Sequence, residues 1–259
     1  MTANDIYQQL LQEANCIRSV TCDGLIAGDP GKTVHKAATC FKLTAEVLQS
    51  AIRQNVDMII THEPTFSRGD RREDASGADL AKWEILDRSG IALYRFHDHA
   101  HDSDPDYIHA GFLRDLELIP AESFPLECLG VRRYRLTEPI CVRDIVQKIR
   151  NKLKLEGIRI VGNEDHPVKV LCLGLGSVGQ DQIDILLNKE CDMFITGETG
   201  EVCTAESVRD ACFYGAKKVL LLLGHYSAEF SGMRLLAESL NERLIPALFL
   251  EGNEVFQYR

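Results

Sequence analysis

The chain has 259 residues, of which 45% are apolar and 7% aromatic, and its formal net charge is −10. This length and composition predict a globular protein with one large or two ordinary domains, and they argue against intrinsic disorder. The negative charge argues against non-specific binding to nucleic acid or to an anionic membrane, because both surfaces repel an acidic protein. A bound metal ion would still add local positive charge that composition does not count.

The cysteines show no C-x-x-C spacing, so neither a zinc knuckle nor a dithiol redox motif is predicted. Their odd number, and the apolar runs that surround several of them, favour free thiols in a reducing compartment. They are Cys16, Cys22, Cys40, Cys128, Cys141, Cys172, Cys191, Cys203 and Cys212. The chain begins with a polar stretch that has no signal-peptide core, and its longest apolar run, at 219–224, is far too short to span a bilayer. We therefore expect a cytoplasmic protein that does not bind a membrane.

The first half of the chain contains an apolar strand pattern that the second half repeats. Residues 57–63 read DMIITHE and residues 192–198 read DMFITGE, with five of seven positions identical. An amphipathic helical stretch precedes each heptad, at 43–55 and 179–190. An apolar strand led by lysine precedes each helix, at 36–41 and 169–174. An apolar strand that ends in histidine follows each heptad, at 90–97 and 216–225.

The order strand, helix, strand, helix, strand therefore occurs twice, which indicates an internal duplication. We predict an α/β fold of two similar, interlocked lobes at 1–125 and 126–259, with room for the C-terminal segment to pack back on the first lobe. The region 103–165 lacks the repeat and is expected to hold helices and a short strand. Because open α/β sheets bind ligands at the carboxyl ends of their strands, we expect a metal site between the lobes.

Histidines and carboxylates follow two strands of the first half. His62 and Glu63 come directly after a buried strand, where a proline ends the strand. The sequence HDHAHD at 97–102 follows the next strand and concentrates imidazoles and carboxylates, which suit zinc, iron, manganese or nickel. A packed histidine at a strand end and a solvated polar loop are the alternative interpretations. Asp98 and Asp102 are further candidates for partners that orient the ring N–H groups of the histidines.

The strand pattern that ends at His225 in the second half is followed by a similar pair of residues. His225 is followed four residues later by Glu229, as His97 is by His101. If a helix begins two residues after His225, Glu229 lies in its first turn, where a carboxylate also stabilises the helix dipole. The candidate metal ligands share a position after predicted strands and are His62, His97, His101, His225 and Glu229.

The segment GLGSVG at 174–179 lies between a predicted strand and a predicted helix and matches the glycine fingerprint of dinucleotide-binding folds. Glu198 follows at a distance along the chain suited to contact a ribose. The matching turn of the first half contains no glycine, and a close-packed turn needs glycine even without a cofactor. We therefore predict no bound nicotinamide or flavin and keep the oxidoreductase interpretation only as an alternative.

Four motifs occur in order along nearly the whole chain, namely D-x-x-I-T-H-x-P-x-F (57–66), H-x-x-x-[D/H] (97–101), I-T-G-E (195–198) and G-H-Y-x-x-E (224–229). With these motifs the sequence resembles the Nif-three-like dinuclear metal-centre family, whose members are often labelled type-two GTP cyclohydrolase I homologues. The resemblance implies two similar α/β lobes with a metal pair between them and assembly into a homohexameric ring. It also implies ligand roles for His62, His97, His225 and Glu229.

The chain departs from the family pattern at two positions. The family usually has two successive histidines where this chain has His62 and Glu63, and an aspartate where this chain has His101. A neutral imidazole cannot bridge two metals as a carboxylate does, so both one and two metals per chain stay open. His99 is a further ligand candidate in this variant cluster.

The preferred functional interpretation is a metal-dependent hydrolase acting on a small molecule, with a nucleotide implied by the family label. A bound metal makes hydroxide available near neutral pH and polarises the bond under attack. Glu63 is the first candidate for the catalytic general base and Glu198 is the second. The contrasting interpretation is a non-catalytic metal-binding scaffold, a metal store or a regulatory protein.

Overall fold

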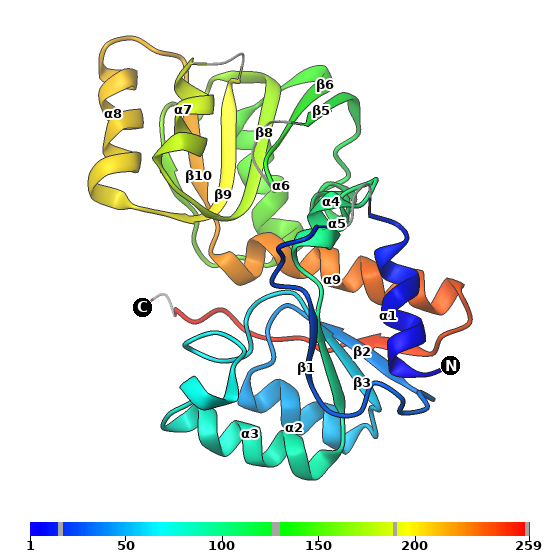
Figure 1. Ribbon diagram of the computed structural model, residues 1–259. Coiled ribbons are helices and arrows are strands. Elements are labelled where there is room, and N and C mark those ends of the chain that lie inside the picture. The colour runs from blue at the N-terminus through cyan, green and yellow to red at the C-terminus, as the bar shows by residue number, and fades with distance from the viewer. Residues whose placement is uncertain (15–17, 126–129, 189–190, 257–258) are drawn as a thin grey trace. The chain divides into compact units, whose positions relative to one another are not determined.

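The computed structural model describes residues 1–259 except 15–17, 126–129, 189–190 and 257–258 (Figure 1). Two compact units are present, the first formed by Met1–Ile108 with Gly232–Asn253 and the second by His109–Ser231 with Glu254–Arg259. The predicted boundary at 125/126 lies at the edge of a segment outside the described residues, as do Cys16 and Cys128. Within the described part of the chain, no helix is both long and apolar enough to cross a membrane.

The first unit has a five-stranded sheet in the order β1-β4-β3-β2-β11, which is parallel except for β1. Its strands are β1 (Gly24–Ala27), β2 (Ala37–Cys40), β3 (Met58–Thr61), β4 (Ala92–Arg95) and β11 (Ala247–Phe249). Its helices are α1 (Ala3–Leu11), α2 (Ala45–Arg53), the short η1 (Arg72–Asp74), α3 (Ala78–Ser89) and α4 (Asp98–Asp102). The unit boundaries fall inside α5 (Tyr107–Asp115) and α9 (His225–Glu242).

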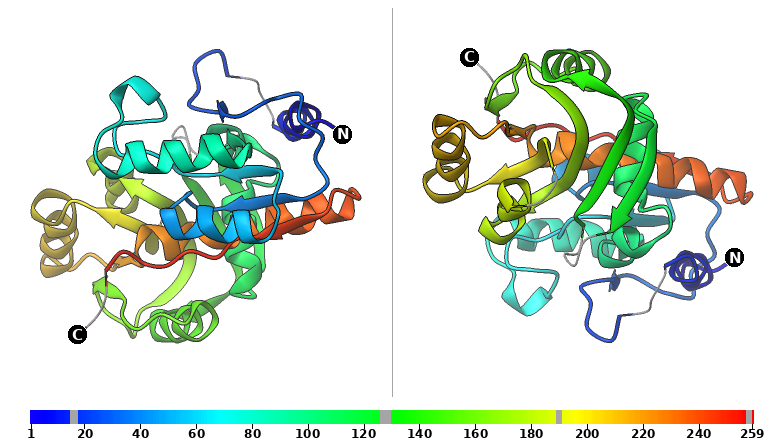
Figure 2. Two further views of the ribbon diagram at one scale, coloured as in Figure 1. Left: turned by 90° about the horizontal axis from the view of Figure 1, so that it is seen from below. Right: turned by 90° about the horizontal axis from the view of Figure 1, so that it is seen from above.

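The strands of the first unit are buried on both faces, as their continuous apolar runs predict. One face is covered by α2 and α3, which lie side by side (Figure 2), and Ile59 and Leu93 pack there with Trp83 of α3. On the other face, the hydroxyl of Thr39 donates a hydrogen bond of 2.6 Å to the carbonyl of Met233 in α9. The sheet therefore contacts helices on both of its faces.

The second unit has a six-stranded sheet in the order β5-β6-β8-β9-β10-β7. Its strands are β5 (Pro120–Pro125), β6 (Arg132–Cys141), β7 (Arg159–Val161), β8 (Pro167–Val178), β9 (Met193–Thr199) and β10 (Val219–Leu222). Its helices are α6 (Val142–Leu153), α7 (Gln180–Asn188), the π-type turn η2 (Glu201–Ala205) and α8 (Glu206–Phe213). β8, β9 and β10 are parallel, and α7 and α6 lie on opposite faces of the sheet (Figures 1 and 2).

The expectation of one short strand within 103–165 was wrong. This region contains β5, β6 and β7, and β6 is ten residues long and antiparallel to β8. Many of the outward-facing side chains of β6 are charged, so its pattern is easily mistaken for a polar connection. The strand forms because it covers the exposed edge of β8, and a neighbouring edge is not visible in local sequence.

Backbone contacts confirm that the two lobes are similar. In the first unit β2, β3 and β4 are parallel neighbours, and their register places Ala37, Met58 and Ala92 side by side. In the second unit β8, β9 and β10 are parallel neighbours in the same chain order. The carboxylate of Asp57 accepts from the N–H of Lys36, and that of Asp192 accepts from the N–H of Lys169. The repeated heptads therefore occupy the same structural position in two separate α/β sheets.

A core substitution in β3 tests this packing. Ile59 is fully buried beneath α2 and α3, so Ile59→Ala should lower the free energy of unfolding by about 2 to 5 kcal/mol. Trp83 is the only tryptophan of the chain and stacks on Phe66 in the same core, so its fluorescence reports urea unfolding of this unit. The matched control Ile52→Ala, at a side chain 39% exposed on α2, should change stability by about 1 kcal/mol or less. Equal losses for the two variants would contradict the proposed packing.

Candidate metal centre

The strands β3 and β4 end level with one another and carry the first two histidines. Their register pairs Thr61 with Arg95, and the N–H of Phe96 donates a hydrogen bond of 2.9 Å to the carbonyl of Thr61. His62 follows the end of β3 and His97 follows the end of β4 by two residues. Both side chains therefore leave the same edge of the sheet.

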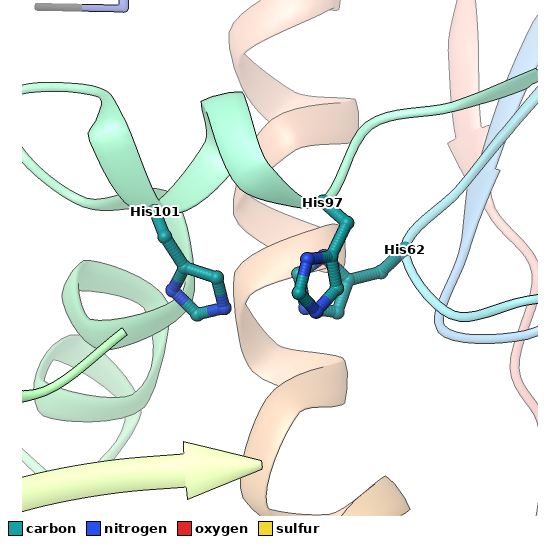
Figure 3. A group of neighbouring side chains, drawn as sticks. All are labelled: His62, His97 and His101. Carbon is teal, nitrogen blue, oxygen red and sulfur yellow. The ribbon is translucent and has the colours of Figure 1, made fainter. Parts of the chain in front are cut away.

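The short helix α4 brings a third histidine to this edge. The N–H of His101 donates to the carbonyl of His97 at 3.2 Å, so the two side chains lie one helical turn apart on one face. The ligand nitrogens of His62, His97 and His101 all lie within 4.8 Å of one another. The rings of His62 and His97 are stacked with centroids 4.5 Å apart, and His101 faces them from α4 (Figure 3).

Each ring of this three-histidine group has its Nδ1 held by an oxygen. Nδ1 of His62 lies 3.2 Å from the carbonyl oxygen of Phe96, and Nδ1 of His101 lies 3.2 Å from a carboxylate oxygen of Asp106. Nδ1 of His97 lies 2.9 Å from the carboxylate of Asp98. A nitrogen that donates to such an oxygen leaves Nε2 of the neutral ring with its lone pair, which is the usual arrangement of metal-binding histidines.

Acidic neighbours favour the protonated form of the His97 ring. Burial by itself lowers the pKa of His97, but hydrogen bonds with Asp98, Cys22 and Glu63 outweigh burial and raise the pKa to about 12. In return, the hydrogen bond from His97 holds the pKa of Asp98 far below its ordinary value. Nε2 of His97 lies 3.5 Å from the carboxylate of Glu63 and its Nδ1 lies 2.9 Å from that of Asp98, so carboxylates at both ring nitrogens favour a cation here.

Asp23 organises the segment 97–99, and sequence reasoning did not identify it. Its side chain is fully buried and accepts hydrogen bonds from the N–H groups of His97 at 2.6 Å, Asp98 at 3.2 Å and His99 at 2.8 Å. These are donors at the amino terminus of α4 that have no acceptor within the helix, so Asp23 caps the helix from a distance. The local sequence TCDGL gives no signal for this role, because its partners lie more than 70 residues away.

Two other members of the HDHAHD segment have structural contacts instead. Nδ1 of His99 lies 2.7 Å from Asp23, and its Nε2 accepts from the backbone N–H of Arg18. Both nitrogens of His99 are therefore engaged away from the three-histidine group. Asp102 forms a two-point ion pair with the guanidinium of Arg18, whereas Asp98 orients a histidine ring.

A second ligand group lies in the second unit. Nδ1 of His225 lies 3.0 Å from a carboxylate oxygen of Glu198, and its Nε2 lies 3.2 Å from a carboxylate oxygen of Glu229. Glu229 is 1% exposed, and a Cβ atom added at Gly176 would lie 2.7 Å from its carboxylate. Glycine at position 176 therefore leaves the carboxylate of Glu229 room to lie beside His225, and a larger residue would displace it.

The two units supply ligand candidates from equivalent strands, although their registers differ by one residue. The hydroxyls of Thr61 and Thr196 contact the carbonyls of Glu63 and Glu198 respectively, so these two glutamates are structural equivalents. The strand pairings make Asp98, not His97, the equivalent of His225. The duplicated fold thus presents different ligand types at matching sheet edges.

The glycine-rich segment does not form a dinucleotide-binding turn. Its residues up to Val178 belong to strand β8, and α7 begins only at Gln180. A Cβ atom at Gly174 would lie 2.8 Å from the ring of Phe194, and Gly176 faces the second ligand group. Close packing at two points inside a strand explains these glycines.

The donor set of the three-histidine group fits a divalent transition metal. Three neutral imidazoles are a common protein ligand set for zinc and leave a fourth position for water or substrate. Cys22, His97 and Asp98 form another group whose ligand atoms lie within 4.8 Å of one another. The residues of the first unit could therefore hold a metal ion without rearrangement of the strands.

Comparison with known proteins agrees with the fold and the motifs. A family model described as Duf34/NIF3 (NGG1p interacting factor 3) matches residues 1–252. A GTP cyclohydrolase 1 type 2 homolog of Streptomyces coelicolor is 27% identical over 230 residues, which cover 85% of this chain and 78% of the relative. A homolog with the same name from Escherichia coli K12 is 28% identical over 215 residues, covering 82% and 81% of the two chains.

Solved structures share the fold at low sequence identity. A Bacillus cereus protein related to NIF3 superposes with a TM-score of 0.78 at 15% identity, covering 100% of this chain and 99% of that chain. Reduced HcgD from Methanocaldococcus jannaschii superposes with a TM-score of 0.76 at 17% identity, covering 97% and 98%. At such identities the likeness concerns the fold alone.

Removal of the Asp23 carboxylate tests its role as a distant cap of α4. In Asp23→Ala, three N–H groups of the segment 97–99 lose their acceptor, so their hydrogen exchange should become about tenfold faster or more, which corresponds to about 1.4 kcal/mol. Mass spectrometry of a peptide that covers residues 97–99 measures the rate of this hydrogen exchange. Asp29→Ala, which removes an acceptor used by Gly31 in a local turn, is the control and should leave this peptide unchanged. Unchanged exchange in Asp23→Ala would contradict the capping role.

Proposed function

Because the chain belongs to the Duf34/NIF3 family, we propose that it is a metal-dependent hydrolase whose metal ion is bound by His62, His97 and His101. The observation that carries the proposal is the convergence of these three rings with each Nδ1 held by an oxygen. Structural histidines have no need for a common orientation, whereas metal-binding rings must point one nitrogen at one ion. Zinc, iron, manganese and nickel all suit this donor set.

His225 and Glu229 are proposed as the second group of ligands. Their support is the contact between them, the burial of Glu229, and the glycine that leaves them room. Glu198 holds Nδ1 of His225 as Asp98 holds Nδ1 of His97. The expectation that both groups serve one metal centre with one or two metals stays a prediction, which metal content tests below.

When bound, a divalent metal supplies Lewis acidity and makes a nucleophile available from water near neutral pH. Glu63 is proposed as the general base, because its carboxylate lies 3.5 Å from His97 and its side chain is 16% exposed. It can therefore accept a proton from a water molecule beside the histidines and pass it to solvent. Glu198 is the second candidate, although its contact with His225 favours an orienting role.

A nucleotide is the proposed substrate class, because curated relatives carry the name GTP cyclohydrolase 1 type 2 homolog. Hydrolysis of a phosphoester or an amide would use the same groups, so a substrate panel needs to cover all three. A homohexamer is the proposed assembly, and its support is the family resemblance alone. A monomer mass from light scattering would contradict the proposed homohexamer but not the proposed metal ligands.

The metal proposal is tested by elemental analysis of protein purified without chelator and without a metal-affinity step. The wild type should contain one or two divalent ions per chain, and His97→Ala should lose at least one of them. His35→Ala, at a side chain 82% exposed, is the matched control and should keep the wild-type content. A wild-type metal content in His97→Ala, or no metal in the wild type after reconstitution, would contradict the proposal.

The same measurement on His225→Ala tests whether the second group shares the centre. If both groups serve one centre, His225→Ala should lower the metal content as His97→Ala does. A wild-type metal content in His225→Ala would show that His225 is not needed for metal binding. Circular dichroism of each variant shows whether the fold is retained.

The catalytic proposal is tested with Glu63→Gln, which keeps the shape of the side chain but cannot accept the proton. Turnover should fall by about 10²- to 10⁴-fold while metal content stays at the wild-type level. Glu46→Gln on the exposed surface of α2 is the control and should have wild-type turnover. A metal-loaded wild type that turns over no nucleotide, phosphoester or amide would instead favour a non-catalytic metal-binding scaffold.

A further inference from the structure

A cluster of three different ligand types lies at the surface of the first unit, beside the three-histidine group. The thiol sulfur of Cys22 lies 3.4 Å from Oδ1 of Asp98, and the same oxygen lies 2.9 Å from Nδ1 of His97. One ligand atom from each residue lies within 4.8 Å of the other two. A carboxylate oxygen of Asp23 lies 3.7 Å from the same sulfur and adds negative charge.

Solvent reaches this cluster, whereas it does not reach the deepest ring of the three-histidine group. Cys22 is exposed, and the side chains of His97 and Asp98 are 23% and 14% exposed. His62 is fully buried. An ion from solution can therefore reach this cluster through the exposed thiol of Cys22.

We propose that Cys22, Asp98 and Nδ1 of His97 form a separate, solvent-facing site for a thiophilic divalent cation of the zinc and cadmium class. A thiolate with an imidazole and a carboxylate favours such ions over magnesium or calcium, which prefer oxygen ligands alone. Binding forms one bond from the metal to sulfur, one to Nδ1 and one to a carboxylate oxygen. The protons of the thiol and of Nδ1 are released to solvent, and no oxidant or reductant takes part.

The site is distinct from the three-histidine group because it uses the other edge of the shared ring. Nδ1 of His97 faces Asp98, whereas its Nε2 faces Glu63. The alternative is purely structural, since Asp98 also accepts hydrogen bonds from the hydroxyl of Thr21 and the N–H of Cys22. In that case Cys22 would be only a further donor to a carboxylate that orients His97.

Cadmium distinguishes the two cases, because a cadmium–thiolate bond absorbs in the near ultraviolet and a cadmium–imidazole bond does not. Titration of the reduced full chain with cadmium should produce the thiolate band at one equivalent in the wild type. Cys22→Ser should lose the band. Cys203→Ser, which removes an exposed cysteine of the second unit, is the matched control and should keep it.

The variant His62→Ala separates this proposal from the proposed function. Because His62 belongs only to the three-histidine group, the band should remain in this variant even when that group no longer holds metal. Absence of the band in the wild type, its persistence in Cys22→Ser, or its loss in His62→Ala would each overturn the separate site. Circular dichroism confirms folding, and if Cys22→Ser or His62→Ala does not fold, Cys22→Ala or His101→Ala replaces it.

Discussion

Asp23 has a fully buried carboxylate that accepts four hydrogen bonds from the segment 97–99, three from backbone N–H groups and one from the ring of His99. The spacing of His97 and His101 on one helical face depends on this contact, because α4 has only five residues and no side-chain cap of its own. A buried charge that loses its donors is strongly destabilising, so the carboxylate and the helix hold each other in place. The geometry of the candidate centre therefore depends on a residue that is not a ligand.

In both units a carboxylate fixes the orientation of a histidine ring. In each, a histidine follows a parallel strand, and its Nδ1 is held by a carboxylate, from Asp98 in the first unit and from Glu198 in the second. Carboxylate partners fix the tautomer and raise the basicity of the nitrogen that faces a metal. Duplication of the fold kept the sheet edge, but the two orienting carboxylates come from non-equivalent positions, because Glu198 corresponds to Glu63 and Asp98 corresponds to His225. The exposed thiol of Cys22 lies against the same orienting carboxylate, which places a second cation site next to the first.

Repetition in the sequence was enough to predict two similar α/β lobes, because the heptads at 57–63 and 192–198 mark the same buried strand in each. The strand β6 was missed because its pairing with β8 is a long-range contact that local patterning does not reveal. Histidines at strand ends were recognisable as a group, since strand direction alone brings them to one edge. Asp23 and Asp106 were not recognisable, because an orienting role depends on where the chain returns in space.

The central claim is that His62, His97 and His101 present Nε2 to one metal ion while oxygens hold their Nδ1 atoms. Anomalous diffraction from a crystal of the zinc-loaded chain, collected at the zinc absorption edge, tests it most directly. The account predicts an anomalous peak within bonding distance of the three Nε2 atoms, with the Nδ1 contacts of His62 to Phe96 and of His101 to Asp106 retained. A zinc-loaded crystal with no peak within bonding distance of these three Nε2 atoms would contradict the account, whether or not zinc also binds at Cys22.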